Sequence, residues 1–336
     1  MATTPHPANP SNTPASTDIT IEEAKRNAAN LAVAQQFPQD ATLVGIGSGT
    51  TITYVVEAIK ALNLPNVNDI HFVPTGYQSR SVIHGAGLRD RRFDSIPPGV
   101  LIDIAFDGAD EVDDELNCIK GGGACMYQEK LVATQARRFV CVAGMSPLTA
   151  LFLDLECCDG SVTDEARQQR IDHRKLQKRL LTKWPSIPIE VEPLATSRVL
   201  GMLRLLGSGD PRLRHGSMEK AGPIKTDQDN FIIDAPFKTL VLPSDLIVNE
   251  TEARPLDGSG NGGVWEVAQL SRAIKSIEGV LSVGIFSGYN GLQAANLGDG
   301  TGGQKPVAAY FGMTDGSVIV KKADESGKVS AIENPN

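Results

Sequence analysis

The stretch "IKGGGACMYQEK", which begins at Ile119, places a lysine beside three glycines, with a glutamate a few residues later. Three consecutive glycines cost backbone entropy, so the run indicates close approach of the backbone to a ligand or a nest of N–H groups for an anion. Lys120 adds a positive charge, and Glu129 adds a carboxylate that can transfer protons. A helix N-terminus favours the glutamate anion and weakens it as a base unless burial raises its pKa. By pattern alone, a plain turn and an ordinary first-turn glutamate remain open.

A second candidate is the acidic run "DGADEVDDE", which begins at Asp107 and holds six acids in nine residues. We predict that a strand ends at its start, so Asp107 and Asp110 are the acids best placed for chemistry. We expect Asp113, Asp114 and Glu115 to be solvated. The spacing does not match a calcium-binding loop, and a solvated acidic loop remains the alternative.

A third candidate is "VGIGSGTT", in which glycines separate an apolar run from a predicted helix. Backbone N–H groups at such a helix N-terminus favour an anion, and Ser48, Thr50 and Thr51 add hydroxyl donors. The glycine spacing fits neither a dinucleotide-binding loop nor a Walker A loop. A phosphate site and a tight strand-to-helix turn are equally compatible with this pattern.

Strands and helices alternate around these loops. We predict strands at 41–47, 70–76, 100–110 and 139–144, and helices at 20–37, 50–62, 77–87 and 126–139. Thr20 and Glu23 form a capping-box pattern at the start of the first helix. A repeat of roughly 30 residues indicates βαβ units and a parallel sheet, which places the three loops together at the C-terminal ends of its strands.

The later part of the chain predicts a second architecture. Apolar runs from Ile187 onward indicate a small α+β unit, and "VAAYFGMTDGSVIVKK" predicts a terminal hairpin. Segment 159–183 has the charge pattern of a surface helix. The predicted fold class is therefore α/β, a Rossmann-like parallel sheet domain with a smaller α+β, ferredoxin-like lid domain. The predicted segments are a disordered tail at 1–18, a catalytic domain at 19–150 plus 292–325, a charged helical insertion at 151–186 and the small domain at 187–291.

Composition excludes several classes of protein. The 336-residue chain carries a net charge of -8, which argues against a nucleic-acid partner. No apolar run is long enough to predict a membrane helix. The five cysteines include no CxxC pair, so we expect free thiols and a cytoplasmic location. The histidines match no ligand spacing, and we predict no metal site.

Together the motifs resemble ribose-5-phosphate isomerase of the A type, in its eukaryotic style. "VGIGSGTT", "DGADEVD", "IKGGGACMYQEKLVA" and "FVCVAG" occur in that family's order, and "KAGPIKTDQDNFIIDAPF", "IEGVLSVGIF" and "AYFGMTDGSV" resemble its later segments. The resemblance covers roughly residues 20–145 and 187–322. It implies an aldose–ketose isomerase of the non-oxidative pentose phosphate pathway, which interconverts ribose 5-phosphate and ribulose 5-phosphate without metal or organic cofactor. We expect a homo-oligomer with this small-molecule substrate and with no nucleic-acid or membrane partner.

The resemblance also implies roles for individual residues. Glu129 would carry the proton between C1 and C2, and Asp107 would help to open the furanose ring. Lys120 and the backbone amides of the glycine run would stabilise the enediolate oxygen. The implied substrate-binding residues are Lys25, Ser48, Gly49, Thr50, Thr51, Asp107, Gly108, Ala109, Asp110, Lys120, Gly121, Gly122 and Gly123. Lys25 would be a phosphate partner.

One departure from the family keeps alternatives open. The family usually has a substrate-contacting lysine after the fourth strand, whereas Pro147 stands here and no lysine follows until Lys175. Segment 148–186 and the glycine-rich loops at 257–263 and 296–303 are also unlike the family. A non-catalytic sugar-phosphate sensor of the same fold is one alternative. An acyl-CoA transferase with a nucleophilic glutamate is another.

Overall fold

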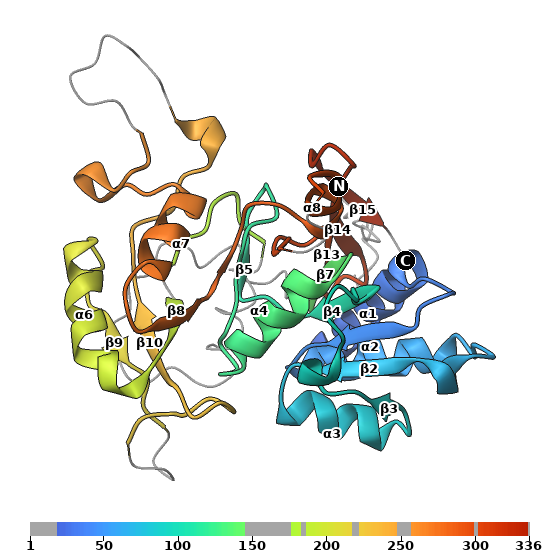
Figure 1. Cartoon of the computed structure of the whole chain (residues 1–336). Helices are drawn as coiled ribbons and strands as arrows, with labels where there is room; N and C mark the ends of the chain where they lie inside the picture. The colour runs from blue at the N-terminus through green and yellow to red at the C-terminus, as the bar shows by residue number, and fades with distance from the viewer. Residues whose placement is uncertain are drawn as a thin grey trace, which may run out of the picture.

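The computed structural model describes residues 19–144, 176–182, 186–216, 222–246, 257–298 and 302–334. These residues form two units side by side, a larger one around an eight-stranded sheet and a smaller one around a four-stranded sheet (Figure 1). The predicted tail at 1–18 and most of the predicted insertion at 151–186 lie outside the described residues.

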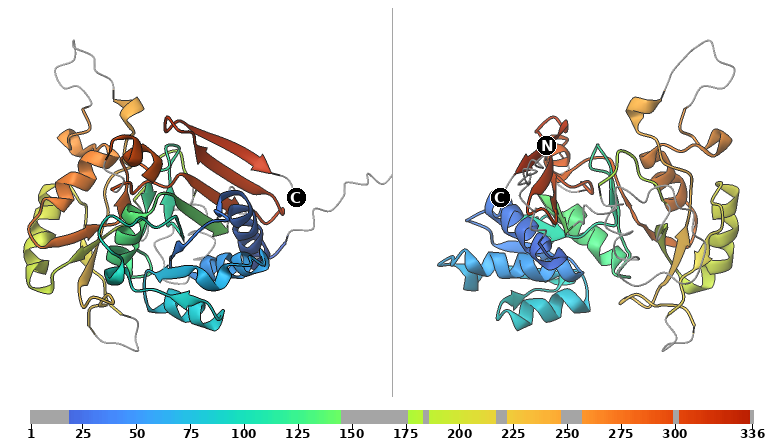
Figure 2. Two further views of the ribbon diagram at one scale, coloured as in Figure 1. Left: turned by 45° about the vertical axis from the view of Figure 1, so that its right-hand side comes forward. Right: turned by 180° about the vertical axis from the view of Figure 1, so that it is seen from behind.

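Six strands of the larger sheet run parallel in the order β3-β2-β1-β4-β7-β13, and β14 and β15 extend it as an antiparallel hairpin (Figure 2). The bounds are β1 Leu43–Ile46, β2 His71–Pro74, β3 Arg89–Asp90, β4 Ile104–Asp107, β7 Phe139–Gly144, β13 Ala308–Gly312, β14 Val318–Ala323 and β15 Val329–Asn334. This is a Rossmann-like strand order, so the predicted parallel sheet is confirmed. Its topological switch point lies between β1 and β4, where such sheets bind ligands.

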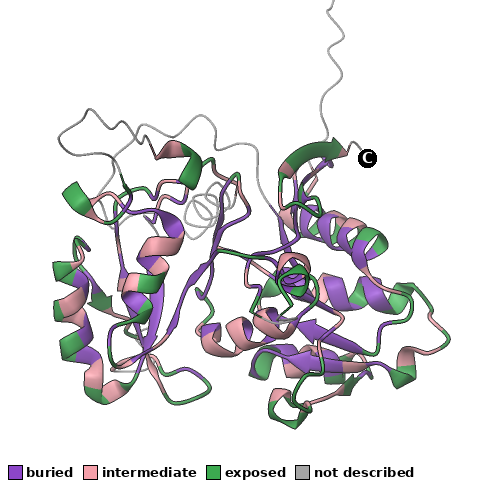
Figure 3. Cartoon of the chain, turned by 45° about the horizontal axis from the view of Figure 1, so that its top comes forward, coloured by how far each residue is buried: buried purple, intermediate pink, exposed green. Residues whose placement is uncertain are grey.

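Helices cover both faces of the larger sheet, and each face has its own apolar core (Figure 3). The bounds are α1 Ile21–Gln36, α2 Thr50–Ala61, α3 Tyr77–Gly85 and α4 Met126–Gln135. The first three pack in one core with Ile104 and Phe106, whereas α4 packs with Ala105, because successive strand side chains point to opposite faces. The capping box of Thr20 and Glu23 is confirmed at α1.

The smaller unit has the element order β8-α6-β9-β10-α7-β11 and the antiparallel strand order β11-β8-β10-β9. The bounds are β8 Ile187–Val191, α6 Thr196–Leu205, β9 Arg212–Leu213, β10 Phe231–Ala235, α7 Val267–Lys275 and β11 Val280–Val283. This is the predicted ferredoxin-like arrangement. Val199, Ile233 and Leu270 are fully buried in a separate core between its helices and its sheet.

A three-stranded sheet joins the two units. Its strands are β5 Glu111–Val112, β6 Cys118–Ile119 and β12 Ile285–Phe286, in the order β12-β6-β5. After β12, α8 Gly291–Asn296 leads back to the larger sheet. The Lys120 N–H donates to Gly284 O at 2.8 Å, and the Gly284 N–H donates to Pro188 O at 2.7 Å. The backbone of the smaller unit therefore fixes the residue that follows β6.

Two glycines allow α1 to lie directly on the larger sheet. Gly144 of β7 and Gly312 of β13 are register partners. A Cβ atom on Gly312 would lie 1.8 Å from Ala24 O, and one on Gly144 would lie 2.5 Å from Cγ of Lys25. The close contact places Lys25 beside the start of α2, where its Nζ lies 3.0 Å from Oγ1 of Thr50.

Two predicted elements differ from the structure at their C-terminal ends. The helix predicted over 126–139 ends at Gln135, after which the Arg137 N–H donates to Ile102 O. The predicted terminal hairpin is confirmed as β13 and β14. It is followed by β15, which the sequence did not reveal because its side chains are largely exposed and lack an alternating apolar pattern.

The surface helix predicted over 159–183 is wrong in the part that the structure describes. Residues 176–182 are not helical. The Gln177 N–H donates to Val112 O of β5 at 2.9 Å, and Leu180 and Thr182 are fully buried. Leu180 packs in the core of the smaller unit, so this segment runs through the junction of the two units instead of lying in solvent.

The sheet memberships support a domain division that we propose on this basis. Residues 19–150 and 292–325 would form the larger domain, to which β15 is added because it pairs with β14. Residues 187–291 would form the smaller domain.

The glycine contact predicts a stability effect. Gly312→Ala should lower the free energy of unfolding by about 3 kcal/mol, because the new methyl group overlaps the backbone of α1. The matched change Gly201→Ala in exposed α6 meets no atom within 4 Å and should raise it by about 0.5–1 kcal/mol. Urea unfolding measures both. Equal midpoints for the two variants would contradict the proposed contact.

Candidate active site

The three loops singled out in the sequence meet at one cavity of about 210 Å³ at the C-terminal ends of β1 and β4. It is lined by Ser48, Gly49, Thr50, Thr51, Gln78, Asp107, Gly108, Ala109, Asp110, Lys120, Gly121, Gly122, Gly123, Glu129 and Val142. Of the predicted site residues, Lys25 alone does not line it, and sequence reasoning missed Gln78 and Val142. A larger hollow of about 580 Å³ between α3, α4 and Asp227 contains none of the predicted residues.

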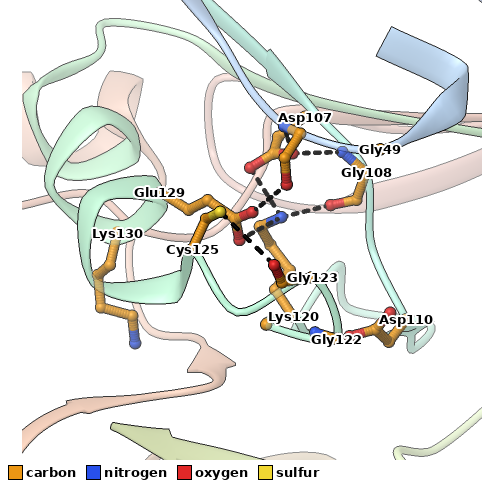
Figure 4. Close-up of polar contacts among 12 residues, drawn as sticks. Gly49, Asp107, Gly108, Asp110, Lys120, Gly122, Gly123, Cys125, Glu129 and Lys130 are labelled. Atoms are coloured by element: carbon orange, nitrogen blue, oxygen red, sulfur yellow. Dashed lines mark hydrogen bonds and ion pairs between the residues drawn. The ribbon is translucent and has the colours of Figure 1, made fainter. Parts of the chain in front are cut away.

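Asp107, Lys120 and Glu129 form an ion cluster at the buried end of the cavity (Figure 4). Lys120 Nζ lies 2.8 Å from Oδ2 of Asp107 and 3.3 Å from Oε2 of Glu129, and it donates to Gly108 O at 2.5 Å. The three side chains are at most 5% exposed. Two carboxylates therefore share one ammonium group where little water screens their charges.

Backbone groups fix the Asp107 carboxylate at the end of β4. Its Oδ1 accepts hydrogen bonds from the Gly108 N–H at 2.7 Å and from the Ser48 N–H at 3.1 Å. A Cβ atom on Gly47 would lie only 2.0 Å from this oxygen. Glycine at position 47 is therefore what lets the loop after β1 close over the acid that ends β4.

Glu129 lies in the first turn of α4 and points toward Lys120, whereas Lys130 points away from the cluster (Figure 4). Glu129 Oε1 accepts the hydroxyl hydrogen bond of Ser48 at 2.7 Å. Oε2 is buried and accepts no hydrogen bond from the described residues, although Lys120 is in ionic contact. This oxygen is free to take a proton.

The N-terminus of α4 has a different carboxylate partner. Oε2 of Glu190, on β8, accepts the Tyr127 N–H at 3.0 Å. Burial raises the pKa of Glu190, against hydrogen bonds from Thr226, Asn230 and Tyr127 that lower it. Because Glu190 satisfies the helix end, Glu129 is not needed there as a cap. Sequence reasoning missed Glu190, which belongs to a distant strand of the smaller unit.

The cluster shifts the pKa values of its members. Burial and the charge of Glu129 raise the pKa of Asp107 to about 7, against the opposing effect of Lys120. Burial alone would lower the pKa of Lys120, but Asp107 and Glu129 outweigh it and raise that pKa. Lys120 therefore stays an ammonium ion at neutral pH, whereas Asp107 is poised between its two forms.

The glycine run after Lys120 lies on the open side of the cavity. Gly122 and Gly123 are exposed, and the Gly122 N–H donates to Oδ2 of Asp110 at 2.9 Å. A Cβ atom on Gly122 would lie 2.9 Å from the other oxygen of Asp110. Asp110 thus lies at the rim of the cavity, apart from the ion cluster.

The loop after β1 presents the N-terminus of α2 to the cavity. Gly49 precedes the helix and supplies no side-chain cap, so the first N–H groups of α2 face outward beside the hydroxyls of Thr50 and Thr51. Lys25 is 7% exposed and contacts Oγ1 of Thr50 and Oε1 of Glu22. The arrangement suits an oxyanion at the N-terminus of α2. Lys25 lies behind Thr50 and does not line the cavity.

Part of the acidic run is not solvated, contrary to the prediction. Asp113 is fully buried and accepts hydrogen bonds from Asn117 and from the Glu115 N–H. Burial raises its pKa to about 6, against the effect of these hydrogen bonds. Asp114 is 47% exposed, as predicted, and forms an ion pair with Lys321 at 2.8 Å. Neither acid lines the cavity. Pro147 lies outside the described residues.

Comparison with known proteins identifies the family. A family model for ribose 5-phosphate isomerase A (phosphoriboisomerase A) matches residues 71–153 and 170–299. The chain belongs to this family. Ribose-5-phosphate isomerases of Schizosaccharomyces pombe and Mycosarcoma maydis are 38% and 39% identical to it over 316 and 307 residues. These matches cover 94% and 90% of this chain and 88% and 82% of the two relatives.

Solved structures of ribose-5-phosphate isomerases have the same fold. A D-ribose-5-phosphate isomerase in complex with phospho-erythronic acid has a TM-score of 0.62 at 25% identity, over 94% of this chain and 100% of that one. Ribose 5-phosphate isomerase A of Neisseria gonorrhoeae has a TM-score of 0.59 at 25% identity, over 90% of this chain and 97% of that one.

Membership of the ribose 5-phosphate isomerase A family establishes the activity. The protein is an aldose–ketose isomerase that interconverts ribose 5-phosphate and ribulose 5-phosphate. This result favours the isomerase over the sensor and transferase alternatives. Within the described ranges, no helix has the length and apolarity to cross a membrane, and no group of His, Cys, Asp or Glu side chains is arranged to hold a metal ion.

The ion cluster predicts a pH-dependent stability effect. Lys120→Met should lower the free energy of unfolding at pH 8 by about 3–5 kcal/mol, because it leaves two buried carboxylates without a cation. The pKa of Asp107 is already raised above its unfolded value by burial, and loss of the Lys120 charge, which opposes this shift, should raise it further. The native state is then least stable above this raised pKa, and the deficit should shrink as pH falls and both groups are protonated.

Adding Asp107→Asn to Lys120→Met provides the control. Removing one of the two charges should recover part of the loss, measured by urea unfolding at pH 5 and pH 8. A deficit that is the same at both pH values and in both variants would argue against the cluster as its cause.

Proposed function

We propose that Glu129 is the base that carries the proton between C2 and C1 of the open-chain sugar phosphate. The observation that supports this role is its free oxygen: Glu129 Oε2 is buried at the cavity beside Lys120 and accepts no hydrogen bond from the described residues. The other oxygen is held by Ser48, so the carboxylate keeps one orientation while it moves the proton between neighbouring carbons. One positioned base that serves both carbons is what an aldose–ketose isomerisation requires.

Lys120 and the glycine run would stabilise the negative oxygen of the enediolate. Removing a proton beside a carbonyl group moves charge onto that oxygen, and fixed donors at such an oxygen are usually the largest catalytic effect. Lys120 lines the cavity as a permanent cation, and the exposed residues Gly122 and Gly123 line it too, with the Gly122 N–H donating to Asp110 and the Gly123 N–H without a partner among the described residues. An ammonium ion that already balances Asp107 and Glu129 needs no rearrangement when the charge develops.

Asp107 would open the furanose ring and exchange protons with the sugar hydroxyls. A carboxyl group with a pKa of about 7 is present in both forms at neutral pH, so it can accept one hydroxyl proton and return it elsewhere. Asp110, at the rim with Gly108 and Ala109, would bind sugar hydroxyls that do not react.

The phosphate group would lie at the N-terminus of α2. Ser48, Gly49, Thr50 and Thr51 line this part of the cavity and offer N–H and hydroxyl donors. Lys25 would add a positive charge from behind Thr50. Binding energy from a phosphate remote from the reacting carbons helps to position those carbons.

We also propose a cytoplasmic homo-oligomer. Cys118, Cys125 and Cys141 are free thiols, which fits a reducing compartment, and Cys157 and Cys158 lie outside the described residues. β15 is the last strand of the larger sheet, its outer edge pairs with none of the described strands, and it exposes Ile332, which supports contact with a second copy of the chain. Light scattering of the purified protein measures the number of copies.

Glu129→Gln tests the proposed base. Its kcat should fall by about 10³-fold while ribose 5-phosphate still binds, because the amide keeps the shape but cannot take the proton. Wild-type protein in D₂O should exchange the C2 proton of the substrate, and the variant should not. Glu57→Gln, an exposed acid on α2, is the control with unchanged kcat. Wild-type turnover of Glu129→Gln in EDTA-treated protein would rule out the role.

The pKa of Asp107 predicts a pH profile. If the ionised form starts the reaction, kcat/KM should fall about tenfold per pH unit below about pH 7, because burial raises the Asp107 pKa to about 7. Asp107→Asn should be slower, and its kcat/KM should not show this fall below pH 7. The substrate phosphate ionises in the assays of both proteins. If the fall in kcat/KM below pH 7 persists unchanged in Asp107→Asn, it comes from the substrate and not from Asp107.

A further inference from the structure

Arg214 reaches the glycine run from the smaller unit. It follows β9, and its side chain is 12% exposed. Its Nη1 donates to Gly121 O and to Gly122 O, at 3.1 Å each. Arg214 does not line the cavity, so it contacts the glycine run from outside the cavity lining.

Asp234 fixes the guanidinium in this orientation. The Nε–H and Nη2–H groups of Arg214 donate to the two carboxylate oxygens of Asp234 on β10, at 2.7 and 2.5 Å. This pairing uses one edge of the planar group and leaves Nη1 for the two glycine carbonyls. Arg214 therefore ties both carbonyls to the sheet of the smaller unit, and Gly121 O also accepts the Ala124 N–H within the turn, at 3.3 Å.

The geometry of the peptide bond links these carbonyls to the cavity. In a trans peptide, the C=O group of one residue and the N–H group of the next point in opposite directions. Because Gly121 O and Gly122 O point to Arg214, the N–H groups of Gly122 and Gly123 point away from it. The first donates to Asp110, and the second has no hydrogen-bond partner in the part of the chain that the structure describes.

We propose that Arg214 is a positioning residue for the isomerisation, which holds the peptide between Gly122 and Gly123 so that the Gly123 N–H points at the enediolate oxygen, and which polarises that peptide group. The proposal rests on the oxyanion role of the glycine run given above. A cation at the carbonyl end of a peptide draws electron density from its N–H end, which becomes a stronger donor. The effect grows with negative charge on the substrate oxygen, so it favours the transition state over the bound sugar.

Arg214→Met tests the proposal through discrimination between two ligands. We expect kcat to fall about tenfold, less than the 10²–10³-fold loss for removal of a direct oxyanion donor, with KM for ribose 5-phosphate changed less than about twofold. Affinity for phospho-erythronic acid, whose carboxylate carries charge near the reacting carbons, should fall by a similar factor. Affinity for ribitol 5-phosphate, which has no such charge, should not change.

The controls separate charge loss from misfolding. Arg212→Met removes an exposed arginine of β9 that pairs with Asp210, and it should leave kcat and both affinities unchanged. Arg214→Met with Asp234→Leu avoids an unpaired acid. Arg214→Lys keeps the positive charge but cannot hydrogen-bond Asp234 and the glycine carbonyls at the same time, as the planar guanidinium group does. The double variant should behave as Arg214→Met, and the lysine variant should lie between it and wild type. If neither methionine variant folds, Arg214→Lys carries the test.

Two outcomes overturn the proposal: equal loss of affinity for both ligands, or unchanged kcat and unchanged discrimination in every folded variant. Glu129→Gln measured in the same assay keeps the two ideas apart. Full turnover in Glu129→Gln removes the proposed base, whatever Arg214 does. An inactive Glu129→Gln beside a fully active Arg214→Met removes the positioning role alone.

Discussion

Lys120 lies between two buried carboxylates that would repel each other without it, and much of the site is arranged to keep it there. β6 carries it to the end of the larger sheet, Gly108 O and Asp107 hold its ammonium group, and a backbone hydrogen bond from its own N–H ties it to Gly284. The ammonium group makes it possible for Asp107 and Glu129 to be buried together. The same burial shifts the pKa of Asp107 toward neutrality. Stability and acid–base chemistry therefore depend on one ion cluster.

The smaller unit contributes to the site without lining the cavity. Glu190 satisfies the N-terminus of α4, Arg214 holds the carbonyls of the glycine run, and Gly284 fixes the backbone at Lys120. Each contact acts on a part of the site that the larger unit supplies. The larger unit brings the reacting groups together and orients Asp107 and Glu129, and the smaller unit supports the backbone around Lys120, the glycine run and the start of α4.

Much of the site could be predicted from the sequence, because alternating strands and helices place the loops at Ser48, Asp107 and Lys120 at one edge of a parallel sheet. The contacts of Glu190 and Arg214 could not, since they join strands far apart in the chain. Charge patterns misled in two places. Asp113 is buried, with three hydrogen bonds to its carboxylate. Residues 176–182 are not helical, and Gln177 donates a backbone hydrogen bond to Val112 of β5. Local composition does not reveal such contacts.

The order of strands in the larger sheet has a consequence for synthesis of the chain. β7 pairs with β4 on one side and with β13 on the other, but the whole of the smaller unit is made between β7 and β13. During synthesis, β7 therefore cannot pair with β13 until the smaller unit has been made, and Val140 and Val142 lack their neighbours on β13 until then. An unpaired strand edge attracts other extended chains. The nascent protein thus passes through a stage in which its central sheet is half built, and release of the C-terminal hairpin closes it.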